Sequence, residues 1–133
     1  MPGRRRRRPD LTIDGMDLFR LFVFDTAAGG GIFVLEDLTL TRGRAPGGTT
    51  GDGGALAVMP GERVFIERVV FQSNSSLNGG GALVVTGSAN GATRAEIRNS
   101  TFAGNRALGV SGGGAIRVQS AELYLAASAL TAN

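Results

Sequence analysis

The side chains that most often carry catalysis and metal binding are scarce or scattered in this 133-residue chain. It contains no His, no Cys and no Lys, and its 14 basic residues, all Arg, stand against 11 acidic residues. General acid–base catalysis needs titratable groups that are placed together. Four of the acids, Asp37, Glu67, Glu96 and Glu122, are instead spread along the chain, one in each of the repeating units described next. We therefore predict no catalytic residue, no metal site and no cofactor.

Two short motifs alternate along the chain and define an internal repeat. The first is Gly-Gly-Ala followed by Leu or Ile, at residues 53–56, 80–83 and 113–116. The second is Phe-x-x-Asn at residues 71–74 and 102–105, with Leu-Thr-Ala-Asn at 130–133 as a third copy. Apolar positions keep step with the motifs, since Leu35, Ile66 and Ile97 are each 31 residues apart and Leu125 follows after 28. A period in this range is typical of a solenoid, in which each unit buries its apolar face against its neighbours.

Within each unit, apolar residues alternate with small or polar residues, which is typical of short β-strands. Leu56 with Val58 and Leu83 with Val85 are clear pairs, and no stretch combines helical spacing with helix caps. We predict an all-β parallel solenoid of about four coils over residues 11–133, paired strand on strand. Because both ends stop within the pattern, we expect a fragment of a longer array that self-associates through its open ends.

Recurring Asn residues and one long turn are the polar features to which a role can be assigned. Asn74, Asn105 and Asn133 recur at one corner of the coil, where a short side chain tolerates left-handed geometry and can hydrogen-bond to adjacent turns. We interpret them as a structural ladder in preference to a binding site. The long turn 41–52 is the candidate for recognition, because loops on a rigid scaffold often carry binding residues; the alternative is a plain polar connection. Its candidate residues are Arg42, Arg44, Thr49, Thr50 and Asp52.

A run of five Arg at residues 4–8 accounts for the basic character of the chain, since the remainder has nine Arg against 11 acids. Such a run can bind nucleic acid or an anionic surface, but no aromatic residue supports it. We interpret residues 1–10 as a disordered Arg-rich leader and expect no nucleic-acid partner. The run is not followed by the apolar core of a signal peptide. No segment approaches the about 20 apolar residues of a membrane-spanning helix.

The paired Gly-Gly-Ala-(Leu/Ile) and Phe-x-x-Asn motifs resemble the repeats of the chlamydial polymorphic outer-membrane proteins. These fall in the right-handed parallel β-helix group, which also contains the pectin-lyase-like enzymes. The resemblance implies a right-handed β-helix at the outer-membrane or extracellular surface. It also implies a non-catalytic adhesin or autotransporter passenger, with a host-surface protein or a glycan as its partner.

The same resemblance raises an alternative function. The chain would then be a fragment of a polysaccharide lyase or hydrolase whose active site lies in coils outside it. Such an enzyme needs an acidic calcium cluster with a Lys or Arg base, or a pair of carboxylates. The scattered acids of this chain favour the non-enzymatic interpretation.

Overall fold

A computed structural model describes residues 11–26, 28–45, 52–88, 92–109 and 113–133. The predicted leader, residues 1–10, lies outside the described residues. The described residues form strands and turns, and no helix occurs among them. The strands are β1 (Leu11–Asp14), β2 (Phe22–Phe24), β3 (Ile32–Thr41), β4 (Leu56–Val58), β5 (Arg63–Gln72), β6 (Ser75–Ser76), β7 (Leu83–Thr86), β8 (Arg94–Arg98), β9 (Thr101–Ala103), β10 (Arg106–Ala107), β11 (Ile116–Gln119), β12 (Glu122–Ala126) and β13 (Ala129–Thr131).

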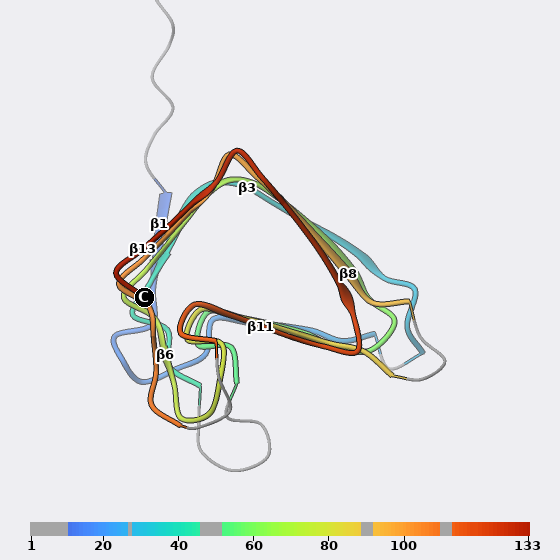
Figure 1. Ribbon diagram of the computed structural model, residues 1–133, viewed down its shortest axis with the longest axis horizontal. Coiled ribbons are helices and arrows are strands. Elements are labelled where there is room, and N and C mark those ends of the chain that lie inside the picture. The colour runs from blue at the N-terminus through green and yellow to red at the C-terminus, as the bar shows by residue number, and fades with distance from the viewer. Residues whose placement is uncertain (1–10, 27, 46–51, 89–91, 110–112) are drawn as a thin grey trace, which may run out of the picture.

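Each strand pairs in parallel with the equivalent strand of the next turn of the chain. The 7-stranded sheet runs β1-β3-β5-β8-β12 and also contains β9 and β13; the 4-stranded sheet runs β2-β4-β7-β11, and β6 pairs with β10. Seen along the stack, the coils superimpose in a triangular outline (Figure 1). The predicted all-β parallel solenoid is therefore confirmed. The sequence predicts about four coils. The structure contains about three full turns, because four successive strands of the 4-stranded sheet are separated by three turns of the chain.

The strand register follows the spacing of the repeat. Leu35 pairs with Ile66, Ile66 with Ile97 and Ile97 with Leu125. The early strands obey the same rule, since β2 pairs Phe22 with Leu56, and β1 pairs Leu11 with Leu38. The offset is constant within one pair of strands but differs along the stack, since Ile66 and Ile97 are 31 residues apart and Ile97 and Leu125 are 28 apart.

One corner of the coil is made by a single residue with positive φ in each turn, at Asp37, Arg68, Asn99 and Ala127 (φ 56°, 52°, 50° and 48°). The sequence predicts two separate strands around this position. Between β3 and β5, the parallel pairing instead continues on both sides of the corner, so each is one bent strand of 10 residues. One left-handed residue turns the chain without breaking the ladder, and Asp and Asn adopt that conformation more readily than most residues.

Inward-facing side chains form one continuous apolar core. Phe71 and Phe102, in register in β5 and β9, are fully buried with ring centroids 4.3 Å apart and planes at 4°. Phe24 and Phe33 stack in the same manner at 4.1 Å. Burying a side chain of this size contributes about 1.5–3 kcal/mol. The core also contains Leu35, Leu40, Leu56, Val58, Val64, Ile66, Val69, Leu83, Val85, Ala95 and Ile97.

The second glycine of the first two Gly-Gly-Ala motifs lies where neighbouring coils approach each other closely. A Cβ on Gly54 would lie 2.2 Å from the carbonyl oxygen of Ser75 and 2.4 Å from that of Gly81, and a Cβ on Gly81 would lie 2.3 Å from that of Gly114. Gly54 N–H donates to Gly81 O at 3.0 Å, and Gly81 N–H to Gly114 O at 2.9 Å. Only glycine permits this approach, so the motif is a packing device that fixes the start of the 4-stranded sheet.

Candidate functional site

The outer face of the 4-stranded sheet carries a groove of about 370 Å³. Its floor is apolar, because the inward alternation of Leu56 and Val58 turns Ala57 outward, in register with Val23 on β2 and Val84 on β7. The rim is mainly polar. It consists of Arg20, Asp25, Asp52, Met59, Thr86 and Gln119. An apolar floor with a few polar groups around it is the usual composition of a small-ligand site.

A network of charged side chains fixes one side of the groove. Arg20 donates from Nε to Gly53 O at 3.1 Å and from Nη2 to Asp52 O at 2.7 Å. Burial lowers the pKa of Arg20, and the negative charge of Asp52 opposes this shift. The Asp52 carboxylate accepts from Gly79 N–H at 2.6 Å and from Arg117 Nη1 at 3.1 Å. Both oxygens of the Asp52 carboxylate accept a hydrogen bond from the protein. These bonds hold the side chain in place, so Asp52 forms a fixed part of this wall of the groove.

The described residues of the set predicted to bind in the long turn, Arg42, Arg44 and Asp52, make separate contacts. Arg42 pairs with Asp14 of the preceding coil, with Nε 2.9 Å from Oδ1, and this hydrogen bond lowers the pKa of Asp14. Arg44 forms a parallel backbone bridge with Ser75. Of the described members, Asp52 lines the groove. Thr49 and Thr50 lie outside the described residues.

The Asn residues of the Phe-x-x-Asn motif lie in one column, bonded from coil to coil. Asn74 Oδ1 accepts from Gly43 N–H at 2.8 Å, and Asn105 Oδ1 accepts from the backbone N–H and Nδ2 of Asn74, each at 3.0 Å. Asn105 Nδ2 donates to Phe71 O at 2.9 Å and to Asn133 Oδ1 at 3.0 Å. Asn74 and Asn105 are buried. Their amide groups thus hold the corner together.

Glu62 is a buried acid that the sequence analysis does not single out. Its side chain is fully buried and accepts hydrogen bonds from Thr26 N–H at 2.6 Å, Thr26 Oγ1 at 2.9 Å and Gly31 N–H at 3.1 Å. Burial alone raises the pKa of Glu62, but the hydrogen bonds from Gly31 and Thr26 outweigh it, so that the pKa lies below its ordinary value. The sequence could have identified Glu62 as buried, because it lies two residues before the inward-facing Val64, and side chains two apart in a strand point to the same side.

We expect Glu62→Gln to lower the melting temperature most near neutral pH. A carboxyl group whose pKa is lowered by folding stabilises the fold above its unfolded pKa, about 4.3, and this contribution is lost as the pH falls through the folded value. Thermal unfolding of both proteins between about pH 3 and pH 7 measures it. The two curves should converge at acid pH. A constant difference across that range would contradict the assigned protonation state.

Apart from Asp52, the rim residues of the groove were also missed by the sequence analysis. Thr86 and Gln119 pair in register at the ends of β7 and β11. The spacing of the repeat was therefore sufficient to predict that these two side chains lie next to each other. Arg20 precedes β2, and its contact with Asp52 joins positions 32 residues apart. No motif relates those two positions.

The described residues contain no group of three or more His, Cys, Asp or Glu side chains that could hold a metal ion. Several acids are instead paired with arginine. Asp37 Oδ1 lies 2.6 Å from Arg68 Nε, and Glu96 Oε1 lies 3.0 Å from Arg94 Nη2. Within the described part of the chain, there is also no helix long and apolar enough to cross a membrane. The groove itself is lined by charged, hydrogen-bonding and apolar side chains.

Residues 68–86 match the Chlamydia polymorphic membrane protein repeat. The matched segment runs from the corner residue Arg68 through Phe71 and Asn74 to the end of β7, so it contains one copy of each motif. The family is associated with the outer membrane and exposed at its surface. Neither a curated protein nor a solved structure matches the chain.

Proposed function

We propose that this chain is a non-catalytic β-solenoid scaffold displayed at a cell surface, of the adhesin or autotransporter-passenger type, which binds a host-surface protein or a glycan. The match of residues 68–86 to a repeat of surface-exposed outer-membrane proteins carries the proposal. The same motifs recur in register above and below that segment, which extends the likeness from one repeat to the stack.

The geometry of the groove supports ligand binding more than catalysis. The groove is held in shape by Arg20, Asp52 and Arg117, so a ligand meets a wall whose hydrogen bonds are already formed. Such pre-organisation reduces the entropic cost of binding. Beyond the groove, Asp37 and Glu96 pair with arginine on the outside of the stack.

The proposal is tested by binding of the purified chain to cultured host cells and to arrays of glycans and receptor ectodomains. Val23, which is 51% exposed on the groove floor, is replaced by Glu to place a charge in the groove without disturbing the core. Leu108→Glu is the matched control, because Leu108 is 50% exposed and does not line the groove. We expect Val23→Glu to abolish binding of a ligand that occupies the groove and Leu108→Glu to preserve it. Absence of binding in every format, or equal binding by both variants, would refute a binding role for the groove.

The alternative enzymatic function leads to a separate prediction. The purified chain should release no unsaturated sugar from polygalacturonate, with or without calcium, because its described residues contain no cluster of acids to hold calcium. Absorbance of the unsaturated product and a reducing-sugar assay measure lyase and hydrolase activity. Calcium-dependent cleavage would overturn the non-catalytic proposal, and Glu67, Glu96 and Glu122 would be the first residues to mutate.

Self-association through an open end of the solenoid stays a prediction. Leu125 on β12 and Leu130 on β13 occupy inward-facing columns yet are 41% and 45% exposed. Exposed apolar strand edges pair with other chains, so light scattering after size exclusion should detect oligomers that increase with concentration. Leu130→Glu should reduce them and Leu108→Glu should not. A monomer at all concentrations would contradict the prediction.

A further inference from the structure

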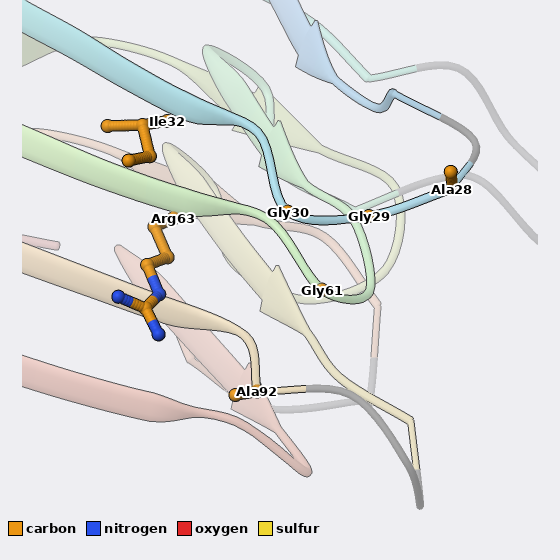
Figure 2. Close-up of a pocket in the computed structure, with 7 residues that line it drawn as sticks. All are labelled: Ala28, Gly29, Gly30, Ile32, Gly61, Arg63 and Ala92. Atoms are coloured by element: carbon orange, nitrogen blue, oxygen red, sulfur yellow. The ribbon is translucent and has the colours of Figure 1, made fainter.

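A second hollow, of about 390 Å³, lies where the turns that precede β3, β5 and β8 run side by side (Figure 2). Glycine backbone forms much of its wall, and a Cβ on Gly30 would meet no atom within 4 Å. Figure 2 shows the Arg63 side chain extending from β5 in the direction of β8, with Ile32 on the neighbouring strand β3. The lining residues are Ala28, Gly29, Gly30, Ile32, Gly61, Arg63 and Ala92.

Arg63 is an exposed cation whose column neighbours cannot neutralise it. The register places Ile32 before it and Arg94 after it. Arg94 is itself engaged, with Nη2 3.0 Å from Glu96 and its guanidinium carbon 4.2 Å from the centre of the Tyr124 ring. Among the described residues, the Arg63 guanidinium makes no ion pair and no side-chain hydrogen bond.

The adjacent acid does not serve as its counter-ion. Glu62 precedes Arg63 in sequence but is fully buried, and its carboxylate accepts from Thr26 and Gly31. Elsewhere on the stack an acid of a neighbouring coil pairs with the arginine, as Asp37 does with Arg68 and Asp14 with Arg42. The free guanidinium at the edge of an open hollow is therefore suited to an anionic group of a ligand, above all a carboxylate bound by two parallel hydrogen bonds.

An apolar strip continues from the hollow across the outer face of the 7-stranded sheet. Ile32 is 65% exposed, and the next outward column pairs Val34 with Phe65, which are 58% and 37% exposed. Exposed apolar groups of this kind on neighbouring strands mark a binding surface more often than single scattered ones do. The strip gives the apolar faces of sugar rings a place to pack beside the charged group.

We infer that this hollow binds a carboxylate-bearing sugar residue of a glycan, with Arg63 as the ligand of the carboxylate and Ile32 and Phe65 as contacts for the rings. Glu36, Glu67 and Glu96 occupy the same outer face. Those acids disfavour a nucleic acid, which carries a phosphate at every nucleotide, whereas the Arg63 guanidinium, which has no ion pair among the described residues, can bind a single carboxylate. The inference goes beyond the proposed function, because it does not depend on where the chain is displayed.

Titration calorimetry of the 133-residue chain with 3′-sialyllactose, a hyaluronan tetrasaccharide and lactose tests this site. We expect at least one acidic oligosaccharide to bind and lactose not to bind. Preference for 3′-sialyllactose would indicate that the hollow binds a carboxylate on a terminal sugar, and preference for the hyaluronan tetrasaccharide would indicate carboxylates within the glycan chain. Arg63→Gln should weaken binding at least about tenfold, and Ala28→Leu, which fills the hollow without a change of charge, should do the same. Arg98→Gln, an exposed arginine on the same sheet face, should change it by less than about twofold.

Several results would overturn the inference. They are equal binding of lactose, no binding of either acidic oligosaccharide, and an equal loss in the Arg63 and Arg98 variants, which would indicate diffuse charge attraction. Tighter binding of a tetraglutamate peptide than of the acidic sugars would indicate that the ligand of the hollow is an acidic peptide and not a glycan. Circular dichroism melting of each variant shows that a lost interaction is not lost folding.

Discussion

Replacing Phe102 by alanine is expected to lower the free energy of unfolding by about 3–5 kcal/mol. The ring is fully buried and stacks on Phe71 at 4.3 Å. It also continues the column that contains Leu40 and Leu130. Strand pairing holds β9 to β5 on one side and to β13 on the other, so the coils have little freedom to collapse into the cavity. Equilibrium denaturation measures the change.

Phe65→Ala is the matched control, because Phe65 is a phenylalanine of the same sheet with its ring on the outer face, 37% exposed. It should cost about 1 kcal/mol or less. A double-mutant cycle between Phe71 and Phe102 should give a coupling of about 0.5–1.5 kcal/mol for the stacked rings. A loss for Phe102→Ala no larger than that for Phe65→Ala would contradict the stacked core.

The second large effect is expected for Asn105→Ala, at about 2–4 kcal/mol. The substitution removes the acceptor for the backbone N–H and Nδ2 of buried Asn74 and the donor for Phe71 O. Each buried polar group left without a partner costs about 1–3 kcal/mol, because folding has already removed it from water. Chemical denaturation gives the total, and hydrogen exchange at the Asn74 amide shows whether the loss is local to the corner.

Asn133→Ala tests the same interaction at an exposed rung. Asn133 Oδ1 accepts from the N–H and Nδ2 of Asn105, but Asn133 itself is exposed, so water can replace it. We expect a cost of about 1 kcal/mol or less. If Asn105→Ala were as mild as Asn133→Ala, the column would not be a stabilising ladder.

The repeat in the sequence was sufficient to predict the architecture. A common offset with two-residue alternation assigns each apolar side chain to a column, and the register then follows, as Ile66 with Ile97 and Phe71 with Phe102 illustrate. The predicted handedness remains untested. The sequence could not show that β3 and β5 bend at Asp37 and Arg68 without a break, because a positive φ is a backbone property that these residue types permit but do not impose.

The candidate site was less accessible from the sequence. Of the described residues predicted to bind in the long turn, Arg42 and Arg44 lie elsewhere, and Asp52 lines the groove with Arg20. Arg117 joins them although it lies 65 residues from Asp52 in the chain. The sequence thus contains the order of the columns, since that order depends on a strand period that every coil shares. Contacts between turns depend on their unequal lengths and on how each side chain crosses from one coil to the next. Only the folded stack therefore places Arg20 against Asp52 and sets Arg63 between Ile32 and Arg94.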